Sequence, residues 1–154
     1  GSADGTARVW DMRHPTRLQA LPFKDLHTDR VRAVAVSATA EYAASGDNSG
    51  DLVIWGLQAD SPAGRSLTGH TGEIGAVGFT PDSKRMISVS TDRTARVWQL
   101  SDDPERDVVV LQHGDEVGQL AIAGDGRWLL TGTITARPSI VSVTVRSAFA
   151  AGVP

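Results

Sequence analysis

The chain has 154 residues, of which 40% are hydrophobic and 21% charged, a composition typical of a folded globular protein and not of a disordered one. Its net charge of -3 comes from 15 basic and 18 acidic residues scattered along the chain, which excludes the basic footprint of a protein that binds nucleic acid or an anionic membrane. The absence of cysteine excludes disulfides, zinc-thiolate sites and thiol catalysis, and because neither a membrane-spanning run nor a signal segment is visible, we expect a cytoplasmic location.

The predicted elements of the first half are short strands separated by turns. Asp4-Gly5 predicts a tight turn, from which Thr6 to Trp10 leave as a strand. The strands that follow are predicted at Arg17–Leu21, Val31–Val36, Tyr42–Ser45, Leu52–Trp55 and Arg65–Thr68. The strand at 31–36 is apolar on one face and mostly apolar on the other, which predicts burial on both sides. The two faces are Val31, Ala33 and Ala35, and Arg32, Val34 and Val36.

The second half of the chain continues in the same way. Strands are predicted at Ile74–Phe79, Arg85–Ser90, Thr94–Gln99, Asp107–Gln112, Val117–Ile122, Trp128–Thr131 and Ser139–Val145. Gly75 and Gly78 lie inside one of them, where glycine usually marks the close approach of another backbone. Since no segment shows a sustained helical period, the sequence predicts an all-β protein.

These strands recur with a period of 43 residues. Three sets of positions show the period, namely His27, His70 and His113; Ser45, Ser88 and Thr131; and Trp55 and Trp98. Trp10 precedes Trp55 by slightly more, at 45 residues. Self-similarity at such a period indicates a repeat architecture, in which each unit needs its neighbours to bury its apolar faces.

The period divides a single partial domain, residues 1–154, into four units. Residues 1–22 are the end of a truncated repeat, 23–64 a repeat, 65–107 the best-preserved repeat, and 108–154 a degenerate last repeat. The first unit starts in its second half, so we expect a fragment of about three and a half repeats. The motif fades beyond Thr131, which is consistent both with a degenerate closing unit and with loss of the repeat by truncation.

The repeated residues resemble those of the WD40 repeat family, whose signature is a Gly-His and a Trp-Asp dipeptide in units of about 40–45 residues. The first dipeptide is literal only at Gly69-His70 and the second only at Trp10-Asp11. Members of the family fold as β-propellers of four-stranded blades around a central channel. The resemblance therefore implies an all-β fold of WD40-type blades, each a four-stranded antiparallel sheet, in an incomplete propeller.

The resemblance also implies a structural tetrad of hydrogen-bonded side chains in each unit. Only the third unit supplies every member, as His70, Ser88, Asp92 and Trp98. The partial sets are His27, Ser45 and Trp55 in the second unit, His113 and Thr131 in the fourth, and Asp4 and Trp10 in the first. Ser49 stands in the second unit where the aspartate belongs, so we expect that unit to be less rigid.

Three chemical alternatives are weaker than this structural interpretation. The three evenly spaced histidines would lie on successive blades, too far apart to share a metal ion. Residues 47–51 contain oxygen ligands but lack the downstream glutamate of a calcium loop, and are better explained as a turn. Ser88, His70 and Asp92 lack a nucleophile elbow, so we expect no catalytic residues. Trp128 interrupts the repeat, and packing at a sheet edge is a better explanation for it than anchoring a partner.

The predicted function is that of a non-enzymatic interaction scaffold, without cofactor or metal. We expect it to bind a protein partner or another domain of its own chain, and not nucleic acid or a membrane. The residues predicted to line the partner-binding face are Asp29, Arg30, Arg32, Asp47, Glu73 and Glu116. Uncovered blade faces predict possible self-association. The alternative hypothesis is the sensor part of a larger bacterial signalling enzyme, a kinase or NTPase with an attached WD40 array.

Overall fold

The structure is a computed structural model, and it describes residues 2–10, 12, 26–58, 64–100, 108–134 and, for the backbone, 143–147. All the regular secondary structure within these residues consists of β-strands, so the prediction of an all-β fold is confirmed. The strands are β1 Val31–Val36, β2 Tyr42–Asp47, β3 Leu52–Gly56, β4 Gly64–Leu67, β5 Ile74–Phe79, β6 Arg85–Ser90, β7 Thr94–Gln99, β8 Val108–Gln112, β9 Val117–Ile122, β10 Trp128–Thr133 and β11 Val143–Ser147.

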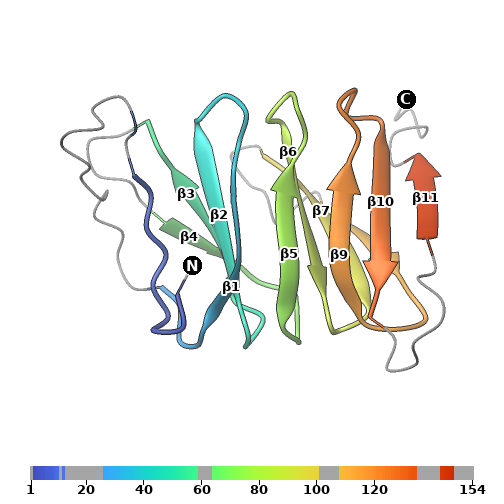
Figure 1. Cartoon of the computed structure of the whole chain (residues 1–154), viewed down its shortest axis with the longest axis horizontal. Coiled ribbons are helices and arrows are strands. Elements are labelled where there is room, and N and C mark those ends of the chain that lie inside the picture. Colours follow the sequence, from blue (N-terminus) through green and yellow to red (C-terminus); the bar gives the residue numbers. More distant parts are fainter. Residues whose placement is uncertain are drawn as a thin grey trace.

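The strands form three sheets, which we call sheets I, II and III. Sheet I has the order β1-β2-β3-β4, sheet II the order β5-β6-β7-β8, and sheet III the order β11-β10-β9. All neighbouring strands are antiparallel. The sheets stand side by side, with the first strand of each, β1, β5 and β9, in a row (Figure 1). The predicted four-stranded antiparallel architecture is thus present in sheets I and II.

The two ends of the chain depart from the sequence predictions. Residues 6–9 are not a regular strand, and Trp10 makes only an isolated bridge. Leu129 of β10 pairs with Arg146, whereas the repeat of sheet II, where Met86 pairs with Trp98, would place Val141 opposite it. Strand β11 is therefore out of register with the repeat. The strand predicted at 17–21 lies outside the described residues.

Apolar side chains fill the space between successive sheets. Ala44, Leu52, Ile54 and Leu67 of sheet I pack with Met86 and Trp98 of sheet II in one cluster. Ile87 and Val97 lie on the opposite face of sheet II, where they pack with Leu129 of sheet III. Because strand residues alternate between faces, sheet II is apolar on both sides and packs against sheet I with one face and against sheet III with the other.

The first strands approach each other where one of the predicted glycines lies. A Cβ added to Gly75 of β5 would lie 2.8 Å from Cα of Gly118 in β9, so the expected close backbone approach is confirmed there. At Gly78 the nearest atoms are instead the methyl groups of Leu120 and Ile122, at 3.1 and 3.2 Å. Glycine is thus needed at the first position for the backbone of the next sheet and at the second for its side chains.

Apolar surface remains exposed at both ends of the row of sheets. Val34 and Val36 are 55% and 57% exposed, so the prediction that β1 is buried on both sides was wrong. Their counterparts in β5, Val77 and Phe79, pack against sheet I, whereas residues 2–10 cover the equivalent face of sheet I only partly, through Val9. At the other end, exposed apolar side chains are those of Trp128, Leu130 and Ile134. Trp128 is therefore not packed away at its sheet edge.

Candidate functional site

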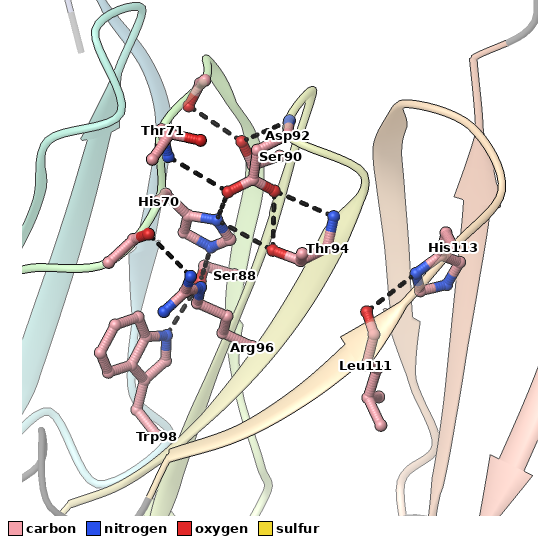
Figure 2. A network of polar contacts seen from close by, with 12 residues as sticks. His70, Thr71, Ser88, Ser90, Asp92, Thr94, Arg96, Trp98, Leu111 and His113 are labelled. Atoms are coloured by element: carbon pink, nitrogen blue, oxygen red, sulfur yellow. Dashed lines mark hydrogen bonds and ion pairs between the residues drawn. The ribbon is translucent and has the colours of Figure 1, made fainter.

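Sheet II contains a continuous chain of hydrogen bonds that crosses its strands (Figure 2). Trp98 Nε1 lies 2.9 Å from Ser88 Oγ, and Ser88 Oγ lies 2.8 Å from His70 Nε2. His70 Nδ1 in turn lies 2.7 Å from Asp92 Oδ2. The four residues that the repeat brings into correspondence are therefore in direct contact.

The hydrogen-bond directions in this chain follow from the donors available. The indole N–H can only donate, so Ser88 Oγ accepts from Trp98 and donates its own proton to His70 Nε2. His70 Nδ1–H then donates to the Asp92 carboxylate, which fixes the imidazole as the neutral Nδ1–H tautomer. Each polar atom of the chain is satisfied, which favours this single arrangement.

Asp92 also ties two loops together at the end of the sheet. Its Oδ1 accepts from Thr94 N at 2.9 Å and Thr94 Oγ1 at 2.7 Å, which closes the turn between β6 and β7. Its Oδ2 accepts from Thr71 N at 3.2 Å, in the loop that leads into β5. Ser90 Oγ donates to the carbonyl of Gly72 at 2.9 Å in the same loop. The tetrad therefore holds the surface loops of sheet II in place.

Burial and hydrogen bonds together determine the pKa values of the histidine and the aspartate of the tetrad. Removal from water lowers the pKa of His70 below its usual value, although the hydrogen bond and the charge of Asp92 act in the opposite direction. Burial alone would raise the pKa of Asp92, but hydrogen bonds from Thr94 and His70 outweigh it and leave this pKa below the usual value. At neutral pH the pair is thus a neutral imidazole on an ionised carboxylate.

This arrangement predicts that the protein loses stability in acid. Below a pH of about 6.5 the unfolded chain protonates His70 more readily than the folded one, so the free energy of unfolding should fall as the pH is lowered. A further loss should follow below a pH of about 3.8, where Asp92 binds a proton more readily in the unfolded chain. Urea unfolding at a series of pH values measures both effects. His70→Gln should flatten the first one, and a rise in stability between pH 7 and 5.5 would contradict it.

Sheet I contains a complete tetrad as well, with its carboxylate supplied from a different position. His27 Nε2 lies 2.6 Å from Ser45 Oγ, which accepts from Trp55 Nε1 at 2.9 Å. His27 Nδ1 lies 3.0 Å from Oδ2 of Asp47, the last residue of β2. The expectation that Ser49 leaves this unit without a carboxylate was therefore wrong, because Asp47 reaches the imidazole from the strand end instead of from the turn.

Asp47 is consequently not part of a partner-binding face. Its side chain is 0% exposed, and its Oδ1 accepts from Ser49 N and Asp51 N at 2.9 Å each and from Ser49 Oγ at 2.8 Å. Burial opposes its ionisation, but hydrogen bonds from Ser49 and His27 more than compensate and lower its pKa. The prediction that placed it on the surface took a buried carboxylate for a loop residue.

The outer units contain half of the tetrad each. In sheet III, His113 Nε2 lies 2.8 Å from Thr131 Oγ1, while Nδ1 contacts the carbonyl of Leu111 at 3.1 Å and not a carboxylate. In the N-terminal segment, Asp4 Oδ1 accepts from Thr6 N at 3.0 Å and from Thr6 Oγ1 at 2.7 Å. Trp10 is 47% exposed.

Arg96 is a residue of the site that the spacing did not reveal. Its Nη2 donates to the carbonyl of Gly69 at 2.7 Å, and its guanidinium lies 6.0 Å from the centre of the Trp98 ring. Gly69 adopts a φ of +143°, and a Cβ there would collide with the guanidinium. The Gly-His dipeptide thus leaves room for Arg96, which covers the indole from outside (Figure 2).

The serine, histidine and aspartate of sheet II do not form an accessible catalytic centre. Ser88 is 0% exposed, and the indole N–H of Trp98 occupies its oxygen, so no substrate carbonyl can approach it. Within the described residues, no group of three or more histidine, cysteine, aspartate or glutamate side chains is placed to hold a metal ion. The same part of the chain contains no helix long and apolar enough to cross a membrane.

The remaining residues of the expected partner-binding face lie at the ends of the sheets near the histidines. Arg32 Nε and Glu73 Oε1 form an ion pair at 2.9 Å, which joins β1 of sheet I to the loop before β5 of sheet II. Asp29 and Arg30 are exposed before β1, and Glu116 is exposed before β9. The structure thus brings Arg32 and Glu73 together and leaves Asp29 and Arg30 on one exposed loop and Glu116 on another.

The family model described as "WD domain, G-beta repeat" matches residues 22–56 and 63–99. These segments contain the tetrads of sheets I and II. The guanine nucleotide-binding protein subunit beta-1 of Nicotiana tabacum is 29% identical over 138 residues, which are 85% of this chain and 37% of that protein. The LST8 homolog of Drosophila melanogaster is 27% identical over 108 residues, 66% of this chain and 34% of that protein.

A third relative, the Denticleless protein homolog of Danio rerio, is 33% identical over 84 residues, 54% of this chain and 13% of that protein. The chain therefore spans well under half the length of each of these three relatives. The matched repeats, the sheets built on them and their buried tetrads agree in position and in residue type. The chain belongs to the WD40 repeat family, and its sheets are blades of a partial β-propeller.

Proposed function

We propose that the chain is a non-catalytic scaffold that binds a protein partner through the charged loops at the histidine end of its blades. WD40 repeat proteins are typically protein-interaction scaffolds, and the tobacco relative is by its name a subunit of a guanine nucleotide-binding protein. The observation that carries the proposal is the division between a buried tetrad, which repeats, and exposed charged loops, which differ between repeats.

The buried tetrad of each of these repeats has a structural role. In sheet II the carboxylate of Asp92 holds the loop before β5 and the turn after β6 with one set of hydrogen bonds. In sheet I the carboxylate of Asp47 does the same for the turn between β2 and β3. Rigidly held loops are favourable for recognition, because little conformational entropy is lost when a partner binds.

The exposed part of each repeat carries its own charges. The position three residues after the histidine is Arg30, Glu73 and Glu116 in successive repeats. Glu73 is paired with Arg32, whereas Asp115 and Glu116 form an acidic loop before β9. The loops beside sheet I thus carry charges of both signs, whereas the loop before β9 is acidic, and a partner with complementary charges would be favoured.

Charge reversal at the two ends of this surface tests the proposal. We expect Arg30→Glu/Glu116→Arg to abolish capture of the proteins that the unaltered chain retains from an extract of its own cells, as quantified by mass spectrometry. Lys84→Glu changes an exposed charge in the turn before β6, at the opposite end of the sheets, and is the matched control. Equal capture by all three chains would contradict binding through the histidine-side loops.

A further inference from the structure

Strand β8 forms the outer edge of sheet II, and its exposed side chains are apolar. Val109 and Val110 are 55% and 42% exposed, and the strand contains no charged residue. In the part of the chain that the structure describes, no other strand pairs with its outer side. Proteins usually protect such an edge from pairing with another chain by means of charges, proline or a short strand. Strand β8 has neither a charge nor a proline.

The fold does not require valine at these exposed positions. In the two sheets, the tryptophans of the tetrads pair with Val108 of β8 and with Gly64 of β4. The residues that follow are therefore equivalent, namely Val109 and Val110 in β8, and Arg65 and Ser66 in β4. Both positions are exposed in both strands. The same place on the blade thus tolerates polar side chains in sheet I, and packing does not explain the valines of sheet II.

The register of β8 determines which backbone groups point outward. The amide of His113 donates to the carbonyl of Arg93 at 2.9 Å, and the pairing of β7 with β8 continues this register. Hydrogen-bonded and non-hydrogen-bonded residues alternate along an antiparallel pair, so Val109 and Leu111 also bond to β7. The alternate residues direct their amides and carbonyls away from the sheet, and these are Val108, Val110 and Gln112.

Strand β8 is anchored on both faces of sheet II. Val108 packs against the apolar cluster between sheets I and II. Leu111, on the opposite face, packs against the two clusters between sheets II and III. The outward row of backbone groups is therefore held in a fixed extended conformation, and a strand that pairs with it loses conformational entropy mainly on its own side.

We propose that β8 binds an extended apolar segment of a partner protein, which adds to sheet II as a fifth strand. Hydrogen bonds to the outward backbone groups of β8 provide affinity, and contacts with Val109 and Val110 select apolar side chains. A charged residue in the paired part of the segment would be disfavoured, because β8 has no charge to compensate its lost hydration. This site lies on the outer edge of the blade and is separate from the charged loops at the histidine end.

The dimensions of the edge favour a peptide segment over a second folded copy of the chain. Strand β8 has five residues and is therefore about 17 Å long. Stable interfaces between folded proteins need roughly 20–30 residues on each side. An extended segment, in contrast, pairs with all the outward groups of β8 without needing a larger surface around them.

Amide hydrogen exchange measured by NMR tests the site residue by residue. The probe is the peptide Lys-Thr-Val-Thr-Val-Thr-Lys, acetylated and amidated at its ends. We expect an excess of this peptide to slow exchange by about tenfold or more at the outward amides, those of Val108, Val110 and Gln112. The amides of Val109 and Leu111, which already bond to β7, should change much less. Unchanged exchange at the outward amides, or outward amides already protected in the free chain, would overturn the proposal.

A second peptide, Lys-Thr-Pro-Pro-Val-Thr-Lys, controls for binding by composition alone. Alternate amides of an added strand face β8, so two adjacent prolines remove one of the required donors in either register. We expect this peptide to bind more weakly by about tenfold or more. Equal protection by both peptides would show that strand pairing is not the mode of binding.

The variant Val109→Arg/Val110→Ser gives β8 the residues that β4 has at the same positions, so it should fold with an unchanged urea midpoint. We expect it to raise the dissociation constant of the first peptide by about tenfold or more, because apolar contacts are replaced by a charge. Arg30→Glu/Glu116→Arg, which alters the histidine-side loops, is the matched control and should bind this peptide normally. Unchanged binding by Val109→Arg/Val110→Ser would contradict the site. Protection of the Val110 amide that rises with chain concentration, without peptide, would show that a second copy occupies the edge instead.

Discussion

Replacement of Trp98 by alanine is expected to lower the free energy of unfolding by about 3–5 kcal/mol. The indole is 0% exposed and packs, with Met86, against Leu52 and Ile54 of the preceding sheet. Its removal would leave a cavity between two sheets and would deprive Ser88 Oγ of its donor. The substitution should therefore weaken the packing between sheets I and II, and not only the contacts within sheet II.

Urea unfolding followed by circular dichroism measures this effect without relying on the fluorescence of the removed residue. Trp98→Phe retains most of the packing and removes the N–H, so it should cost about 1 kcal/mol for the lost hydrogen bond. Trp128→Ala is the exposed control and should cost less than about 1 kcal/mol, provided that all chains are compared at a concentration at which they are monomeric. A similar loss for Trp98→Ala and Trp128→Ala would rule out the role of Trp98 between the sheets.

The spacing of the histidines, hydroxyls and tryptophans was enough to predict which side chains correspond between sheets I and II. In an antiparallel sheet the register fixes which residues lie opposite each other, so a residue type that recurs at one register position recurs in one place. Ser45 and Ser88 accordingly make the same two contacts, to a histidine and to an indole, in sheets I and II. Residues that the register fixes are therefore predictable from the sequence.

The carboxylate of the tetrad was not predictable in this way. It reaches the imidazole from the turn in sheet II, as Asp92, and from the end of the strand in sheet I, as Asp47. The two repeats have exchanged their residues, since Ser90 occupies the position of Asp47 and Ser49 that of Asp92. When the repeats are aligned at a fixed period, the second repeat only shows a serine in place of an aspartate. The alignment does not show that a carboxylate two residues earlier can reach the same imidazole.

The exposure of the outer faces of the row of sheets could not be predicted from the sequence either. An apolar strand such as β1 requires a neighbour on each face to be buried, and its own residues do not reveal whether both are present. Val34 is exposed although its counterpart Val77 packs in the cluster between sheets I and II. The same pattern of residues thus has two outcomes, and only the position of the repeat in the row decides between them.

Asp47→Ala is expected to lower the free energy of unfolding by about 3 kcal/mol. The substitution would leave the His27 imidazole and the amides of Ser49 and Asp51 without their common acceptor, in a region where Asp47 itself is fully buried. Each unsatisfied buried group costs about 1–3 kcal/mol, and partial access of water to the turn should reduce the total. Ser49→Ala removes one of the three donors to Asp47 Oδ1, from an exposed residue, and should cost only about 1 kcal/mol.

The double variant Asp47→Ser/Ser49→Asp distinguishes a specific tetrad from general damage to the turn. It recreates in sheet I the order of serine and aspartate found in sheet II, where the carboxylate accepts from the histidine at 2.7 Å. We therefore expect it to recover most of the stability that Asp47→Ala loses, measured by urea unfolding at pH 7. A double variant as unstable as Asp47→Ala would show that the strand-end position is required for the carboxylate in sheet I. If Asp47→Ala were instead as mild as Ser49→Ala, the buried hydrogen bonds of Asp47 would contribute little, and the tetrad of sheet I would be dispensable for its stability.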